Sequence, residues 1–158
     1  MSKAPAKAEA AEQSHQEQRK TAAQEAHRVA ERMQQFNGVV ATPLYHPPPG
    51  AEQLHCAEEW GYVFYPSRLE SLKRQDLLIE AAALLRCPLK VLIGGTGGQY
   101  ERYAGLIERH GLQDRVRLVG TFTEAEKRAY YAHALGVVFT PFDEDLGYIT
   151  LEAMCAAK

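Results

Sequence analysis

The chain has 158 residues and a formal net charge of −2, enough for one domain with a hydrophobic core and some additional sequence. This charge provides no basic field for nucleic acid or an anionic membrane. No apolar run approaches the roughly 18 residues of a membrane span, and the N-terminus lacks the apolar segment of a secretory signal. Three widely spaced cysteines, Cys56, Cys87 and Cys155, predict reduced thiols in a cytoplasmic protein; peripheral membrane attachment stays open.

The N-terminal part is predicted to hold a tail, a helix and a strand. Residues 1–13 are low in complexity and are expected to be disordered. Ser14 and Glu17 fit a capping box that opens a helix, and Asn37-Gly38 ends it. The apolar stripe of this helix consists of Ala22, Ala26, Val29, Met33 and Phe36.

A strand-like segment, VVATPLY, follows this helix and completes the first predicted part, residues 14–45. The next predicted part is a proline-rich linker over residues 46–60, because three consecutive prolines fit neither a helix nor a central strand. We therefore place the domain boundary between Tyr45 and Glu59.

From residue 61 to residue 158 the pattern alternates between strand and helix four times. Strands are predicted at 62–66, 89–93, 116–119 and 137–140, and helices at 74–85, 99–110, 124–134 and 147–157. Thr123 is the expected N-cap of the third of these helices. The expected apolar side of the first helix consists of Leu77, Leu78, Ala81, Leu84 and Leu85.

Continuous apolar strands between amphipathic helices predict an α/β fold, a doubly wound, Rossmann-like parallel sheet covered on both faces. Four strands are fewer than the five or six of such a domain, so we expect the domain to be incomplete.

The most informative stretch runs from the fourth strand into the last helix and carries Glu144 and Glu152. It places two carboxylates near a helix N-terminus at the carboxyl end of a strand, where open α/β sheets bind ligands and where phosphate is favoured. Carboxylates accept hydrogen bonds from diols, and a sugar nucleotide has diols on both sides of a diphosphate. The alternative, an acidic loop and a surface glutamate, is about equally favoured by the pair alone. The run from Asp143 to Asp145 predicts no metal site, because consecutive carboxylates point in different directions.

Two further features follow the first and second predicted strands. Arg68 and Lys73 stand near a helix start, and taken alone they are more simply interpreted as two solvated side chains than as anion ligands. The helix dipole disfavours cations at this position, which adds some support to anion binding. The turn IGGTGG, residues 93–98, lacks the G-x-G-x-x-G spacing and follows the wrong strand for a dinucleotide motif. It is interpreted as a tight turn that lets a ligand approach the backbone.

Taken together, the motifs are far more specific than any one of them. A strand followed by S-R-L-x-x-x-K, a glycine-rich turn, D-R-V-R-L-V-G and P-F-D-E-D-L-G-Y-I-T-L-E-A-M resembles the C-terminal half of GT-B glycosyltransferases. The similarity is to the large retaining family, family 4 or group 1, that includes sucrose and glycogen synthases. It covers residues 21–158, most strongly from Gly61, and Glu144 and Glu152 match the E-x7-E motif of the family.

This resemblance implies a donor-binding role for specific residues. Arg68 and Lys73 would hold the donor diphosphate, Glu144 would contact the sugar hydroxyls, and Glu152 would bind the ribose diol. The backbone N–H groups of Gly147, Tyr148 and Ile149, at the start of the last helix, would face phosphate or sugar. Gly95 would lie near the nucleotide base.

The reaction implied by the resemblance transfers a hexosyl group from a UDP-, GDP- or ADP-sugar to an acceptor hydroxyl, with retention and without a metal cofactor. The acceptor, which could be a lipid carrier, a polysaccharide, a protein or a small molecule, stays open.

Two departures from the family pattern bear on activity. Ala157 stands where the family has a glycine, and the sequence stops at Lys158. The acceptor-binding domain is expected to be missing, with residues 14–45 as its remnant. A half-cleft neither excludes water nor positions an acceptor, so we expect the isolated chain to be inactive. It would need the missing domain or a partner chain.

Two other functions are alternatives to a glycosyltransferase. A non-catalytic nucleotide-binding module, or a subunit that complements a partner chain, is the main alternative. A receiver-like signalling domain is disfavoured, because Arg68 and Gly120 stand where its acidic cluster and phosphorylated Asp would be.

Overall fold

The computed structural model describes residues 27–43, 47–142, 144 and 147–158. The chain divides into two compact units, Met1–Pro47 with Glu144–Gly147, and Pro48–Asp143 with Tyr148–Lys158. The predicted tail and the predicted capping box at Ser14 lie outside the described residues. Within the described part of the chain, no helix is long and apolar enough to cross a membrane.

In the first unit, a helix spans residues 27–37. It ends as predicted, because Gly38 adopts the left-handed conformation with φ 67°. Of the predicted apolar stripe, Phe36 is 73% exposed and Met33 is also exposed. The predicted strand after the helix is wrong over residues 39–43, which have no regular secondary structure; the last residues of that prediction lie outside the described ranges.

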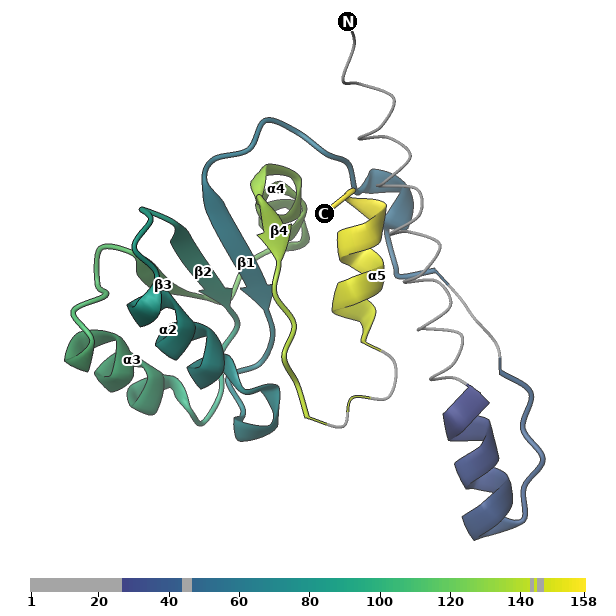
Figure 1. Ribbon diagram of the computed structural model, residues 1–158. Helices are drawn as coiled ribbons and strands as arrows, with labels where there is room; N and C mark the ends of the chain where they lie inside the picture. The colour runs from purple at the N-terminus through teal and green to yellow at the C-terminus, as the bar shows by residue number, and fades with distance from the viewer. Residues whose placement is uncertain (1–26, 44–46, 143, 145–146) are drawn as a thin grey trace, which may run out of the picture. The chain divides into compact units, whose positions relative to one another are not determined.

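The second unit contains a parallel four-stranded sheet in the order β3-β2-β1-β4, with both faces covered by helices (Figure 1). Its strands are β1 (Tyr62–Pro66), β2 (Lys90–Gly94), β3 (Val116–Gly120) and β4 (Gly136–Val137). Its helices are α2 (Gln75–Leu84), α3 (Tyr100–Arg109), α4 (Glu124–His133) and α5 (Tyr148–Cys155), and two short 3-10 helices are η1 (Ala51–Gln53) and η2 (Ser71–Lys73). The predicted doubly wound α/β architecture is confirmed.

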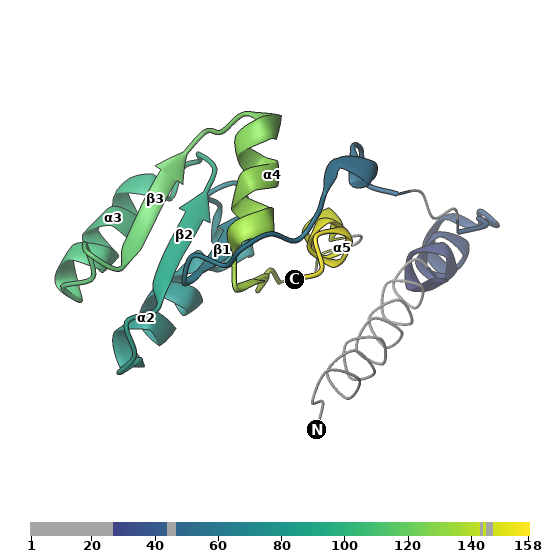
Figure 2. The ribbon, with the colours of Figure 1, turned by 90° about the horizontal axis from the view of Figure 1, so that it is seen from above.

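Side-chain alternation along β1 divides the hydrophobic core between the two faces of the sheet. Tyr65 is fully buried with residues of α2 and α3, whereas Phe64 is fully buried with residues of α4 and α5. Figure 2 shows the sheet between α2 and α3 on one side and α4 on the other. The N-cap predicted at Thr123 is confirmed, and the structure shows a full capping box: the Thr123 hydroxyl accepts from Glu126 N at 3.2 Å, and the Thr123 N–H donates to the Glu126 carboxylate at 2.8 Å.

The expected apolar side of α2 is wrong. The residues of α2 that are buried are Gln75, Ile79 and Ala82. Leu84 is 83% exposed. The other expected residues are Leu77, Ala81 and Leu85, which are exposed, and Leu78, which packs partly against the core. The helix is apolar on most sides, so its sequence does not define one buried face.

The fourth strand is shorter than predicted. β4 pairs with β1 only through Val63 with Gly136 and Phe64 with Val137. The ladder does not continue, because the N–H of Thr140 donates to the hydroxyl of Tyr65 at 3.2 Å instead of to a strand carbonyl.

The strand order places a topological switch point between β1 and β4. The chain proceeds outward from β1 through β2 to β3, and α4 then returns it to the opposite side of β1. Open α/β sheets bind ligands at the carboxyl ends of the strands beside such a point. The loops that follow β1 and β4 are therefore the first place to look for a site.

Candidate functional site

The loop after β1 presents two cationic side chains at the carboxyl edge of the sheet. Arg68 is exposed, and Lys73 is partly exposed at the end of η2. Arg74 joins η2 to α2 in the left-handed conformation, with φ 56° and ψ 40°. This loop, residues 67–74, carries both predicted diphosphate ligands.

The first half of this loop is held by its neighbours through main-chain hydrogen bonds. The fully buried Gln75 donates from Nε2 to the carbonyl of Arg68 at 2.7 Å. Leu69 donates from its N–H to the carbonyl of Thr96 at 3.0 Å and accepts from the N–H of Gln99 at 3.0 Å. Gln75 is on α2, and Thr96 and Gln99 are on the loop that follows β2. Several elements therefore fix the position of Arg68.

The glycine-rich turn after β2 is shaped by this same loop. A Cβ on Gly95 would lie 2.3 Å from the carbonyl oxygen of Ser67, and one on Gly97 would lie 2.4 Å from that of Leu69. Gly95 also has φ +112°, a conformation that L side chains rarely adopt. At Gly98, by contrast, an added Cβ meets nothing within 4 Å. The close approach that we expected for a ligand is therefore occupied at two glycines by the protein's own main chain.

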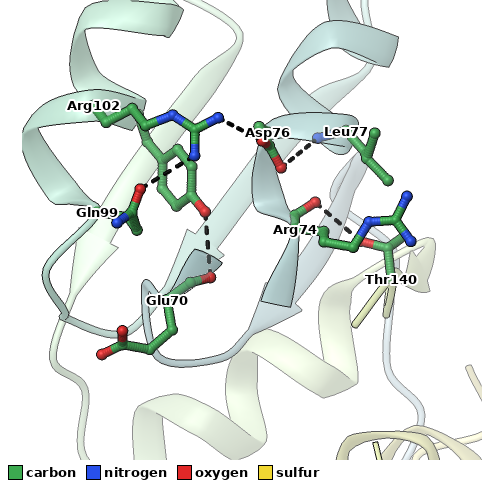
Figure 3. A network of polar contacts seen from close by, with 8 residues as sticks. Glu70, Arg74, Asp76, Leu77, Gln99, Arg102 and Thr140 are labelled. Carbon is green, nitrogen blue, oxygen red and sulfur yellow. Dashed lines mark hydrogen bonds and ion pairs between the residues drawn. The ribbon is translucent and has the colours of Figure 1, made fainter. Parts of the chain in front are cut away.

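The second half of the loop is attached to the chain that extends beyond β4. The buried hydroxyl of Tyr65 donates to the carbonyl of Lys73 and accepts from the N–H of Thr140. The Thr140 hydroxyl in turn donates to the carbonyl of Arg74 at 3.2 Å (Figure 3). One tyrosine hydroxyl thus joins the Lys73 turn to the segment that leads toward the acidic motif.

The N-terminal turns of α2 and α3 are joined beside the loop. Arg102 donates to the carboxylate of Asp76 at 2.8 Å and to the amide oxygen of Gln99 at 3.2 Å (Figure 3). Tyr103 reaches the carbonyl of Glu70 at 3.4 Å, and burial raises the pKa of its hydroxyl. These contacts complete a frame around residues 67–74.

Glu152 lies on α5 and is almost fully buried, at 8% exposure. Its Oε1 accepts from Lys127 Nζ at 3.0 Å, and its Oε2 accepts from the hydroxyl of Tyr131 at 2.7 Å. Lys127 also pairs with Glu124 at 2.9 Å. Burial alone would lower the pKa of Lys127, but its hydrogen bonds to the two glutamates outweigh this and raise it. Burial and the bond to Glu152 raise the pKa of Tyr131, which therefore remains a proton donor.

Sequence reasoning missed Lys127 and Tyr131 as partners of Glu152. Their spacing of four residues places them on one side of α4, and a buried tyrosine hydroxyl needs an acceptor. That signal was present in the sequence. The identity of the acceptor was not, because it depends on how α4 packs beside α5.

Some of the predicted site residues share a loop or a helix, and others belong to a different unit of the chain. Arg68 and Lys73 share one loop, while Gly95 is on the adjacent loop. Within the second unit, Tyr148, Ile149 and Glu152 are all on α5. Glu144 and Gly147 belong to the first unit, and Gly147 has φ 62°. The ligand roles of all eight residues stay predictions.

The described residues contain no group of three or more His, Cys, Asp or Glu side chains that could hold a metal ion. Asp143 and Asp145, which we considered for such a site, lie outside the described ranges.

Comparison with known proteins identifies a family and curated relatives for this chain. The family model for glycosyl transferases group 1 matches residues 52–158. A curated relative, the "Putative glycosyltransferase EpsD" of Bacillus subtilis, is 30% identical over 137 residues, covering 80% of this chain and 35% of the relative. The D-inositol 3-phosphate glycosyltransferase of Salinispora tropica is 35% identical over 108 residues, covering 60% of this chain and 22% of the relative. This chain therefore spans about a third or less of their length.

Solved structures of glycosyltransferases share the fold. HepE from Anabaena, solved with UDP and glucose, is 28% identical with a TM-score of 0.54; the match covers 60% of this chain and 27% of that one. A variant of TarM from S. aureus, solved with UDP, is 28% identical with a TM-score of 0.61; the match covers 80% of this chain and 27% of that one. The architecture is that of GT-B glycosyltransferases, and the chain belongs to the glycosyl transferases group 1 family.

Proposed function

We propose that this chain binds the nucleotide diphosphate of a sugar donor at the carboxyl edge of the sheet, between β1 and β4. It forms the donor-binding half of an enzyme that transfers a hexosyl group to an acceptor hydroxyl with retention. The observation that carries the proposal is the framed loop 67–74. Two cations stand on a main chain that several elements hold in place, at the edge where open α/β sheets bind their ligands.

Each candidate residue has a separate task in this proposal. Arg68 and Lys73 neutralise the diphosphate, with the N-terminus of α5 as a further source of positive potential. The same groups stabilise the charge that develops on the diphosphate as it leaves, without a metal ion. Glu144 accepts hydrogen bonds from the sugar hydroxyls, and Glu152 accepts them from the ribose diol.

UDP is the first nucleotide to test, since HepE and TarM were solved with UDP and HepE also with UDP-glucose. GDP and ADP serve as comparisons. The donor sugar and the acceptor are not assigned.

Sugar transfer further requires an acceptor-binding part, supplied by another domain or by a partner chain. The curated relatives are much longer than this chain. A donor half alone leaves the reacting carbon open to water and cannot position an acceptor. The chain by itself is therefore expected to bind nucleotide without measurable transfer.

Calorimetric titration of the folded chain with UDP, GDP and ADP tests the proposal by measuring nucleotide binding. Each charge-assisted contact contributes about 1.5–3 kcal/mol, so Arg68→Ala and Lys73→Ala should each weaken the binding of the preferred nucleotide roughly 10- to 100-fold. Arg86→Ala is the matched control, because Arg86 is exposed between α2 and β2, at the opposite edge. Absence of binding by a folded chain, or an equal loss in the control, would refute the site.

The stereochemical outcome needs a form of the enzyme that carries the acceptor-binding part. The anomeric proton coupling of the product, measured by NMR, should show the configuration of the donor. An inverted product would refute retention. Nucleotide binding without transfer in that form would instead support the non-catalytic module.

A further inference from the structure

The carboxylate of Glu152 is fixed by two donors from the same side of α4. Lys127 Nζ lies 3.0 Å from Oε1, and the hydroxyl of Tyr131 lies 2.7 Å from Oε2. A carboxylate has about four acceptor positions, two on each oxygen. After these two bonds, one acceptor position on each oxygen makes no further hydrogen bond within the described residues.

Both donors are themselves held in place. Tyr131 is fully buried, and its ring packs edge-on against Phe64, with centroids 5.4 Å apart and an interplanar angle of 86°. The ammonium of Lys127 is shared with Glu124 at 2.9 Å. If Glu152 turned away, the buried tyrosine hydroxyl would lose its acceptor, which is unfavourable for a polar group away from water. Its raised pKa keeps this hydroxyl protonated as a donor. The orientation of the carboxylate is thus set before any ligand arrives.

Two remaining acceptor positions on one rigid carboxylate suit two adjacent hydroxyls. Resting on the proposed function, in which Glu152 binds the ribose, we propose that Lys127 and Tyr131 are positioning residues that aim this carboxylate at the ribose diol. They thereby make the site select ribonucleotides over 2′-deoxyribonucleotides.

The selection follows from the geometry of the pair. A ribose offers its 2′- and 3′-hydroxyls together, whereas a 2′-deoxyribose leaves one of the fixed acceptor positions without a donor. A site built to hydrogen-bond a hydroxyl strongly disfavours the analogue that lacks it. Without the hydrogen bonds from Lys127 and Tyr131, the carboxylate is free to turn toward the single remaining hydroxyl or toward water. The preference for the ribonucleotide over the 2′-deoxyribonucleotide then falls.

The test is the ratio of dissociation constants of 2′-deoxy-UDP and UDP, or of the corresponding pair for whichever nucleotide binds. At 1.5–3 kcal/mol for a hydrogen bond to a charged group, the unmodified chain should show a ratio of roughly 10 to 100. Tyr131→Phe should lower this ratio severalfold. Lys127→Met, which keeps the length of the side chain, should do the same and serves as a second variant where Tyr131→Phe fails to fold.

The neighbouring Tyr130→Phe is the matched control. It removes a hydroxyl that makes no hydrogen bond within the described part of the chain, although its ring also packs against Phe64. The control should keep the full ratio. A ratio that stays unchanged in a folded Tyr131→Phe or Lys127→Met variant removes that residue from the proposal, and an unchanged ratio in both overturns it.

Glu152→Gln separates this inference from the proposed function. If the chain binds no nucleotide, or if Glu152→Gln keeps the full ratio, the ribose role of Glu152 is wrong. If Glu152→Gln loses the ratio while both positioning variants keep it, the donor site stands and only the positioning roles are overturned.

Discussion

At the scale of single residues, left-handed backbone positions define where the second unit turns. Gly95 and Gly120 hold this conformation without a side chain, whereas Arg74 and Ala157 hold it with one. For L-residues this conformation costs roughly 1–2 kcal/mol. These two positions therefore carry strain that a glycine would remove.

Ala157 gives a stability prediction because the end of α5 is a regular capping motif. The N–H of Ala157 donates to Met154 at 3.0 Å, and the N–H of Lys158 donates to Ala153 at 2.8 Å. Ala157→Gly should raise the free energy of unfolding by about 1 kcal/mol, measured by urea denaturation. Ala81→Gly, an exposed site inside α2, should instead lower it by roughly 0.5–1 kcal/mol. A loss of stability in Ala157→Gly would contradict the left-handed cap.

The glycine-rich turn provides a second prediction at this scale. Gly95→Ala should lower the free energy of unfolding by about 2 kcal/mol or more, because the new Cβ meets the Ser67 carbonyl and φ is unsuitable. Gly98→Ala is the matched control and should change it by less than about 1 kcal/mol, since its Cβ faces open space. Equal effects in denaturation experiments would show that the β1–α2 loop does not lie over this turn.

At the scale of elements, β1 connects the site to the core through two tyrosines with different tasks. Tyr65, near the carboxyl end of the strand, joins the Lys73 turn to Thr140. Tyr62, at the amino end, donates to the carbonyl of Tyr130 at 3.0 Å, and burial raises its pKa to about 12. Both hydroxyls belong to tyrosines of β1, but they lie toward opposite ends of this strand.

This pair separates stability from binding. Tyr65→Phe and Tyr62→Phe should each cost about 1 kcal/mol of stability for a lost hydrogen bond. Only Tyr65→Phe should also weaken nucleotide binding, by severalfold, because it releases the turn that carries Lys73. Calorimetry and denaturation on the two variants check this. The same nucleotide affinity in both would mean that the Tyr65 hydroxyl does not position the loop.

Local patterns determined most of the elements, while tertiary packing determined the rest. β1 has the predicted bounds, and α4 begins at the predicted Thr123 cap, since strand propensity and capping are local properties. The buried face of α2 and the short β4 could not be read from their own residues. In both cases a neighbouring element decides which side packs and where pairing stops.

The candidate site shows the same division. Arg68 and Lys73 follow a strand at a position that topology alone marks as ligand-binding. The partners of Glu152 depend on α4 lying beside α5, and the contacts at Gly95 depend on where the β1–α2 loop passes. Such relations between segments distant in sequence have no local signature.

At the scale of the whole molecule, strand order locates the proposed site. β1 and β4 are neighbouring strands: the chain moves outward from β1 through β2 to β3 and then returns to β4 on the other side of β1. Arg68 and Lys73 follow β1, and the start of α5 follows β4. The central claim is that a nucleotide diphosphate binds at this edge.

The most direct test is to follow the backbone amide resonances of the chain by NMR during a titration with UDP. The largest shifts should occur in residues 68–73 and in the first turns of α5, and should be absent from the opposite edge, around residues 86–89. Shifts concentrated at that opposite edge, or no shifts with UDP, GDP or ADP in a folded chain, would contradict the donor-binding role.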